Sequence, residues 1–246
     1  MNRKFYQQSL EEIAKKYHLS KDVKDKVFDD LFHHELAKRI SFLLSPGIRV
    51  LELGYGEGTV SSEIFSTHKI QREIIEGSEA LAIQAHKDLG NDAKVHCCLF
   101  SEFMPDHQYD LVLATNVFEH VEDTKELFDQ IYKWLSPNGI CVVTVPNSES
   151  FHRRIAVKMG LQVSTKDLSQ RDITVGHLRV YDLAQLSHEI RMSGFRIAKT
   201  EGMVIKFLNN HLQLNLPKDL IVALHEIASE YPAEYAANLY LEIGKN

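Results

Sequence analysis

Cysteine is scarce in this chain, with three in 246 residues: Cys97, Cys98 and Cys141. Two of them are adjacent, so the spacing fits neither a disulfide framework nor a zinc-binding motif. The apolar surroundings of all three favour a role as small hydrophobic side chains. Because few disulfides suit a reducing compartment, we expect a cytoplasmic protein, and we expect no metal site.

Long apolar runs are also missing. No stretch reaches the roughly 18 residues of a membrane-spanning helix, and the charged segment 1–26 lacks the apolar core of a secretory signal. Lysine and arginine (28) are outnumbered by aspartate and glutamate (34), and the net charge of −6 argues against a nucleic-acid surface. The hydrophobic fraction of 44% suits one sizeable globular α/β domain with additions.

The most informative segment is an apolar run broken by alternating glycines, VLELGYGEG at residues 50–58. Its first half predicts a buried strand, and helical periodicity follows over residues 60–65. Between them Gly54, Gly56 and Gly58 let the backbone of a turn approach a ligand closely. Strand, glycine turn and helix N-terminus form the nucleotide-binding opening of a doubly wound α/β sheet.

Two details distinguish the kinds of nucleotide. Dinucleotide enzymes use G-x-G-x-x-G, which seats a diphosphate on the helix N-terminus, whereas here the spacing is G-x-G-x-G and Thr59 replaces the last glycine. Glu52, two residues before the turn, would repel a diphosphate and suit a cationic ligand such as S-adenosylmethionine. The motif E-L-G-x-G-x-G resembles the first motif of the class I S-adenosylmethionine-dependent methyltransferases.

A second acidic position fits this resemblance. Glu76 ends a short apolar stretch about 20 residues beyond the glycine turn, the distance at which a carboxylate reaches ribose hydroxyls in such folds. With the following Gly77 and Ser78, it is expected to hold the cofactor. The alternative is an ordinary solvated loop acid.

A third segment predicts a strand over residues 93–98. By the resemblance, the following Leu99 and Phe100 sandwich the adenine ring, and Ser101 or Glu102 supplies its polar partner. Phe103 is expected to be a core residue instead.

The fourth segment, YDLVLATNVFEHV at residues 109–121, closely resembles the fourth strand of the family and the turn after it. Asn116 and Val117 stand at its carboxyl end, where ligands bind in open α/β sheets. A helix is predicted next, stopped by residues 136–139, and residues 140–145 predict strand five. The resemblance covers residues 48 to 146.

This family resemblance implies a Rossmann-like sheet of seven strands, sandwiched by helices, with strand seven antiparallel between strands five and six. We expect one methyltransferase domain over 1–246. Its parts are an N-terminal helical cap (1–45), a cofactor-binding core (46–146), an insertion after strand five (147–182), and a C-terminal part of the sheet with added helices (183–246).

Three histidines are candidate bases, because an oxygen or nitrogen acceptor must lose a proton during methyl transfer. His120 follows strand four, His152 follows strand five, and His177 lies at the end of the insertion. Alternatively, His120 fixes its own turn at a helix start, and His177 with Arg179 fastens the insertion to the sheet.

The insertion is basic within an acidic protein. Residues 150–180 hold six basic and two acidic side chains, a local balance of +4, for which a solvated cationic face is the simplest explanation. The segments 146–153 and 176–181 look like a bacterial methyltransferase subgroup of polysaccharide and sugar-modifying pathways. On that resemblance Arg153, Arg179 and Tyr181 would bind an acidic or phosphorylated acceptor.

The sequence thus predicts a methyltransferase that uses S-adenosyl-L-methionine and releases S-adenosyl-L-homocysteine. Its partner would be a small hydroxylated or anionic metabolite, with sugars and carrier-linked intermediates among the candidates, and the C-terminal helices could support a homodimer. The alternatives are a cofactor-binding protein of this fold without turnover and an NAD-dependent oxidoreductase.

Overall fold

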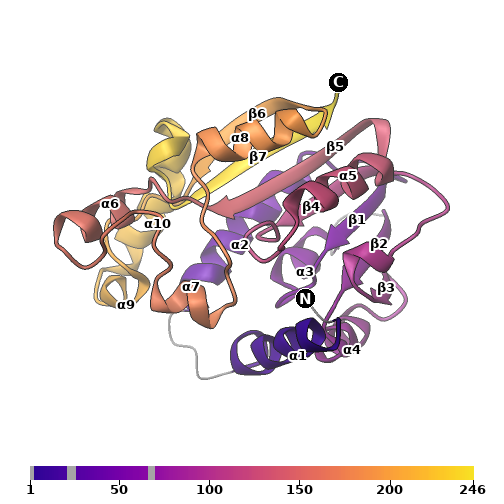
Figure 1. The fold of residues 1–246 in the computed structure, drawn as a ribbon, viewed down its shortest axis with the longest axis horizontal. Helices are drawn as coiled ribbons and strands as arrows, with labels where there is room; N and C mark the ends of the chain where they lie inside the picture. The colour runs from indigo at the N-terminus through magenta and orange to yellow at the C-terminus, as the bar shows by residue number, and fades with distance from the viewer. Residues whose placement is uncertain (1–2, 21–25, 66–69) are drawn as a thin grey trace.

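Seven strands form one twisted sheet in the order β3-β2-β1-β4-β5-β7-β6, within the residues 3–20, 26–65 and 70–246 that the computed structural model describes (Figure 1). Strands β1 to β5 pair in parallel, and β7 runs antiparallel to both β5 and β6. The strands are β1 (Arg49–Leu53), β2 (Gln71–Glu76), β3 (Lys94–Cys97), β4 (Tyr109–Thr115), β5 (Leu135–Pro146), β6 (Phe195–Met203) and β7 (Asn238–Lys245). The predicted Rossmann-like sheet with an antiparallel seventh strand is confirmed.

Helices lie on both faces of this sheet. They are α1 (Arg3–Ile13), α2 (Lys26–Ser41), α3 (Thr59–Phe65), α4 (Glu79–Leu89), α5 (Thr124–Trp134), α6 (Phe151–Lys158), α7 (Gln170–Thr174), α8 (Leu183–Met192), α9 (Asn210–Gln213) and α10 (Lys218–Glu226). A π-helical turn, Ala14–His18, continues α1. Within the described part of the chain, no helix is both long enough and apolar enough to cross a membrane.

Two apolar clusters hold the layers together, one on each face. Leu127 and Ile131 of α5 pack with Ile190 of α8 in one cluster, while Leu36 and Ile40 of α2 belong to the other. Leu36 and Ile40 are fully buried, so each stabilises the fold by about 1.5–3 kcal/mol. Alternate side chains of the central strands supply both clusters, which is why these strands read as continuous apolar runs.

Strand five begins earlier than the sequence predicts. The strand starts at Leu135, directly after α5, because Leu135 pairs with Tyr109 at the start of β4. A register shift between Tyr109 and Leu111 accommodates the turn residues 136–139 within the strand. The prediction of a break before residue 140 is therefore wrong in this detail.

The cysteines differ more than expected. Cys141 is fully buried in β5, as a small hydrophobic side chain would be, and Cys98 is partly buried. Cys97 is exposed at the end of β3, an edge strand with only one neighbour, so the core role predicted for it is wrong.

The segment after β5 leaves the sheet and returns to it at the same point. A parallel bridge joins Asn147 to Tyr181, and the Ser148 amide donates to the Tyr181 carbonyl at 2.7 Å. Between these contacts the chain forms α6 and α7, which lie beyond the end of β5 (Figure 1). This segment is therefore a helical insertion whose two ends are hydrogen-bonded to each other, rather than a simple connection.

Candidate functional site

A cavity of about 1400 Å³ lies at the carboxyl ends of the parallel strands. Each of the five strands contributes a residue at or just after its end: Gly54, Gly77, Leu99, Asn116 and Pro146. Further walls come from the N-terminal cap, the insertion and the segment after β6, including Leu10, Tyr17, His152, Arg171 and Lys206. Ligand pockets are commonly about 300–1,000 Å³, so this one has room for two ligands at once.

The glycine turn after β1 is built for close backbone approach. Gly54, Gly56 and Gly58 all have positive φ, and each lines the cavity. Gly58 has a second reason to be glycine, because a Cβ there would lie 2.2 Å from the hydroxyl oxygen of Tyr55. The turn therefore tolerates no larger side chain at Gly58 without displacing the Tyr55 ring.

Glu76, at the end of β2, is fixed beside this turn. Its carboxylate accepts hydrogen bonds from the backbone amides of Tyr55 and Ser78, each at 2.8 Å. Burial raises the pKa of Glu76, while these two amides act in the opposite direction. Glu76, Gly77 and Ser78 all line the cavity, so the structure places the predicted ribose-binding residues beside the glycine turn.

Glu52 also lines the cavity, but its charge is balanced. The Arg72 guanidinium of β2 forms a buried ion pair with the carboxylate, and Ser61 donates to it at 2.6 Å. From the sequence, Glu52 is expected to repel a diphosphate and to favour a cationic cofactor. Because Arg72 neutralises Glu52 in the structure, the Glu52 charge does not by itself select the cofactor.

The residues predicted to hold the adenine lie at the same cavity. Leu99 and Phe100 line the cavity, as do both Ser101 and Glu102. A Glu102 carboxylate oxygen accepts a hydrogen bond from the Leu99 amide at 3.1 Å. Phe103 is buried in the core, as expected, with its ring 5.6 Å from that of Trp134.

The end of β4 carries a strained backbone position. Asn116 has a φ of 53°, a left-handed conformation that few residues other than glycine adopt. Thr144 on β5 holds it, since its hydroxyl donates to the Asn116 side chain at 3.1 Å and its carbonyl accepts from the Asn116 amide at 2.9 Å. Asn116 and its neighbour Val117 both line the cavity. Such strain is characteristic of ligand-binding positions.

Two of the three candidate histidines come together. The rings of His120 and His177 lie 4.8 Å apart, edge to face, and both line the cavity. Nδ1 of His120 lies 3.2 Å from the Gly176 carbonyl, which ties the turn after β4 to the insertion. Burial lowers the pKa of His120 to about 3, assisted by the neighbouring His177, so this ring is neutral.

The alternative role given to His120 needs correction. α5 starts at Thr124, with Asp123 as its N-cap, so His120 is not a helix-start residue. Its backbone amide does close its own turn, donating to the Val117 carbonyl at 3.0 Å, while its ring contacts Gly176 of the insertion.

His152 lies elsewhere along the same cavity. Its pKa is lowered well below the ordinary value by burial, and then by the positive charges of Lys206 and Arg153. The ring is therefore neutral and can accept a proton, although only weakly.

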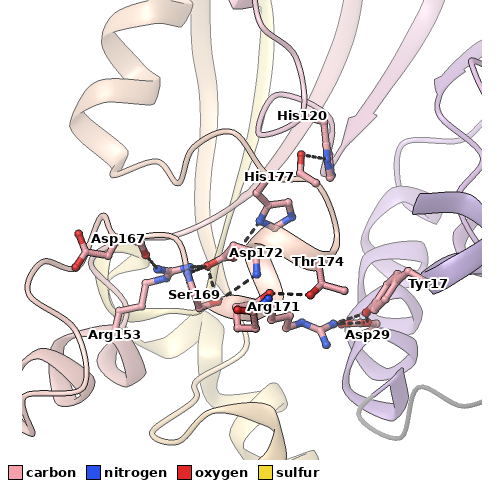
Figure 2. Close-up of polar contacts among 12 residues, drawn as sticks. Tyr17, Asp29, His120, Arg153, Asp167, Ser169, Arg171, Asp172, Thr174 and His177 are labelled. Atoms are coloured by element: carbon pink, nitrogen blue, oxygen red, sulfur yellow. Dashed lines mark hydrogen bonds and ion pairs between the residues drawn. The ribbon is translucent and has the colours of Figure 1, made fainter. Parts of the chain in front are cut away.

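Asp172 is the centre of a buried network in the insertion (Figure 2). Its carboxylate accepts from Arg153 Nη2 at 2.7 Å, from the Ser169 hydroxyl at 2.6 Å, and meets His177 Nδ1 at 3.0 Å. Burial alone would raise the pKa of Asp172, but the His177 hydrogen bond and the Arg153 charge hold it well below its usual range. Arg153 lines the cavity, with its guanidinium committed to this network.

The other two predicted substrate residues are not among the described residues that line the cavity. The Arg179 guanidinium donates to the carbonyls of Val121 at 2.5 Å and Glu122 at 3.1 Å. Tyr181 is fully buried, and its hydroxyl donates to Glu189 at 3.1 Å. These contacts favour the alternative reading of Arg179, which fastens the insertion to the turn after β4.

Lys206 and Glu119 also line the cavity, although neither is among the site residues predicted from the sequence. Lys206 follows β6, and its Nζ donates to the Asn210 side chain at 2.5 Å. Burial lowers the pKa of Lys206 to about 8, with a further contribution from Arg171. Glu119 is 0% exposed, and burial raises its pKa to about 8. Glu119 precedes His120 in the fourth motif, which was the available signal; Lys206 had none.

Comparison with curated proteins finds partial relatives. The chain is 30% identical over 106 residues to a ubiquinone biosynthesis O-methyltransferase of Bradyrhizobium diazoefficiens, a match covering 41% of each protein. It is 26% identical over 108 residues to phosphoethanolamine N-methyltransferase 1 of Zea mays, covering 41% of this chain and 21% of that one. The chain thus spans less than half the length of these relatives.

Solved structures share the fold over nearly the whole chain. Magnesium protoporphyrin IX methyltransferase (ChlM) of Synechocystis PCC 6803, with S-adenosylhomocysteine bound, has a TM-score of 0.63 at 15% identity, covering 99% of this chain and 98% of that one. The plantazolicin methyltransferase BpumL, also with S-adenosylhomocysteine, has a TM-score of 0.58 at 17% identity, covering 99% and 98%.

The family profile described as "Methyltransferase domain" matches residues 28–200, more than half of the chain. The match includes the glycine turn, Glu76 and the end of β4, and stops within β6. Together with the fold, it confirms the resemblance to class I S-adenosylmethionine-dependent methyltransferases over the oxidoreductase alternative; the sugar-pathway subgroup stays a prediction. On this match, the chain belongs to the methyltransferase domain family.

Proposed function

We propose that the cavity binds S-adenosyl-L-methionine beside the glycine turn and methylates a small acceptor that carries an anionic group next to Lys206. This proposal rests on one observation: the same cavity joins Glu76, hydrogen-bonded to the turn, with a partly buried lysine outside the cofactor motifs. The cofactor, when bound, supplies a methyl group already activated by its sulfonium.

The residues that would hold the cofactor are those of the first four strand ends. The glycine turn offers close backbone approach, Glu76 would accept from the ribose hydroxyls, and Leu99 and Phe100 would cover the adenine. Glu76 suits this role because its two amide contacts hold the carboxylate against the turn before any ligand arrives.

Lys206 supports an anionic acceptor. Among the described residues its ammonium donates to the neutral side-chain amide of Asn210, whereas Arg153 and Arg171 are each paired with a carboxylate. A buried ammonium group is stabilised by an anion, and lysine is a common partner of phosphate and carboxylate. The name of one relative agrees with this chemistry, since phosphoethanolamine carries a phosphate.

His152 is the candidate proton acceptor for a group held at Lys206, because both residues line the cavity, and burial together with the Lys206 charge lowers the pKa of His152 and keeps its ring neutral. Its neutral state leaves a lone pair for an acceptor hydroxyl or amine.

The test is calorimetric titration with S-adenosylhomocysteine, followed by transfer of labelled methyl from S-adenosylmethionine into a metabolite extract. We expect binding to wild type and labelled product, with Lys206→Met losing product but retaining S-adenosylhomocysteine binding. Lys158→Met, which removes an exposed lysine of the insertion, is the matched control. Binding without product in any extract would support the non-catalytic alternative, and no binding would refute the proposal.

The predicted homodimer remains a proposal. Exposed apolar side chains in and beside α9 and α10 support it: Leu212, Leu214 and Leu220 are 43%, 39% and 44% exposed. Light scattering of the purified protein would decide between monomer and dimer.

A further inference from the structure

Three potential metal ligands meet at the junction of the turn after β4 with the insertion. One ligand atom each from Glu119, His120 and His177 lies within 4.8 Å of the others, and all three residues line the cavity. Within the described residues, no other group of histidine, cysteine and acidic side chains meets this geometry.

Glu119 is the unusual member of this group. It is 0% exposed, and neither carboxylate oxygen has a hydrogen-bond partner among the described residues. Leaving a buried acceptor without a partner costs about 1–3 kcal/mol, and more if the group is charged. Buried polar groups are nearly always satisfied, so such a carboxylate indicates a missing partner, and a cation would fill that role.

The two histidines are already oriented as metal ligands are. His120 places Nδ1 on the Gly176 carbonyl at 3.2 Å, and His177 places Nδ1 on the Asp172 carboxylate at 3.0 Å. Metal-binding histidines typically donate one ring N–H to a carbonyl or carboxylate, which fixes the tautomer and leaves Nε2 for the metal. Arg153 and Ser169 in turn donate hydrogen bonds to the Asp172 carboxylate, which fixes the residue that orients His177 (Figure 2).

We propose that Glu119, His120 and His177 bind a divalent first-row transition-metal ion of the Zn²⁺, Fe²⁺, Mn²⁺ and Co²⁺ class. Two imidazole nitrogens and one carboxylate suit these ions, whereas Ca²⁺ and Mg²⁺ prefer sites made of oxygen. Three protein ligands leave coordination positions open, as in catalytic sites.

The open positions would face the cavity, because all three residues line it. An oxygen of the acceptor could then complete the coordination, and a bound cation lowers the pKa of a coordinated hydroxyl. This assignment to the acceptor rests on the proposed function, whereas the metal site rests on the geometry alone.

A second set of similar residues provides a control. Glu73 meets His96 Nε2 at 2.5 Å and His107 Nε2 at 3.2 Å, and none of these three residues lines the cavity. There Nε2 of each histidine contacts a different carboxylate oxygen of Glu73. The three side chains therefore contact one another directly and leave no shared position for a metal ion.

The experiment is titration of the full chain with cobalt chloride, followed by visible absorption, which reports Co²⁺ bound to protein ligands. We expect saturable absorption in wild type, reversed by Zn²⁺. Glu119→Gln should weaken Co²⁺ binding by at least roughly tenfold, because even second-shell losses cost 10–100-fold. His177→Gln should do the same, and the double variant His96→Gln with His107→Gln should bind as wild type does.

Titration of each variant with S-adenosylhomocysteine shows whether it is folded. Glu119→Gln is the most informative variant, because it keeps the side-chain shape and breaks no hydrogen bond to another described residue. Absence of a saturable Co²⁺ spectrum in wild type would overturn the site. So would a spectrum that survives in Glu119→Gln and is lost in the double variant. If wild type binds Co²⁺ but not S-adenosylhomocysteine, the proposed function falls and the metal site stands.

Discussion

Arg171 of α7 forms an ion pair with Asp29 of α2, Nη2 to Oδ2 at 2.6 Å, between residues 142 positions apart (Figure 2). The same guanidinium lies 2.5 Å from the Tyr17 hydroxyl. All three residues line the cavity, so this contact joins the insertion to the N-terminal cap beside the ligands. The cap and the insertion are therefore coupled through one arginine.

Loss of this pair should loosen the insertion. We expect Arg171→Gln and Asp29→Asn each to lower the free energy of unfolding, with a coupling of about 0.5–1 kcal/mol because the pair is partly exposed. A double-mutant cycle by urea unfolding measures it. Arg154→Gln, which breaks the more exposed pair with Glu149, is the control. Strict additivity at Arg171 and Asp29 would show that the two segments are not coupled.

Glu76→Gln should weaken S-adenosylhomocysteine binding by roughly 10–100-fold, because a neutral amide cannot accept as strongly from two vicinal hydroxyls and the two backbone amides. Calorimetry measures the dissociation constant. Glu230→Gln, at an exposed glutamate, should leave it unchanged. Equal affinities of the Glu76 variant and wild type would remove Glu76 from the cofactor site.

Gly58→Ala should destabilise the cofactor turn through a clash as well as through backbone strain. Gly160 provides a matched control, since its φ of 71° is nearly that of Gly58 at 72°, but a Cβ there would have no heavy atom within 4 Å. Gly160→Ala should therefore lower the free energy of unfolding only by the cost of a left-handed backbone conformation for alanine, about 1–2 kcal/mol. Thermal unfolding and S-adenosylhomocysteine titration should show a larger loss for Gly58→Ala; equal losses would mean that Tyr55 moves aside freely.

Lys206 makes stability depend on pH. Its folded pKa of about 8 lies below the ordinary 10.5, so its charged form is disfavoured in the folded state. Below about pH 8, Lys206 is charged in both the folded and the unfolded state, so the full free-energy cost of burying its charge lowers stability. Between about pH 8 and 10.5 the unfolded chain binds more protons than the folded one, so the free energy of unfolding rises with pH.

Lys206→Met should accordingly raise the free energy of unfolding at neutral pH by about 1–2 kcal/mol, since part of the side chain still reaches the cavity. Urea unfolding of wild type and variant at neutral pH and near about pH 9 should show a shrinking difference. Lys158→Met serves as the exposed control. A difference independent of pH would assign the effect to packing rather than to charge.

The sequence was sufficient for the sheet and the cofactor turn. Alternating and continuous apolar runs predict β1 to β5 in their order along the chain. They can do so because the pattern of buried side chains in each strand is written in its own residues. The antiparallel β7 between β5 and β6 came from the family resemblance instead. The start of β5 was missed because its pairing with Tyr109 is a long-range contact.

What a charged side chain touches was decided by the tertiary structure. From sequence alone Arg179 and Glu52 look available to ligands, yet Arg179 is spent on backbone carbonyls and Glu52 on Arg72. His120 meets the turn at Gly176 across 56 positions of sequence, which brings Glu119, His120 and His177 together. Spacing along a chain fixes which residues share a strand or a helix face, whereas contacts between segments depend on how the whole chain closes on itself.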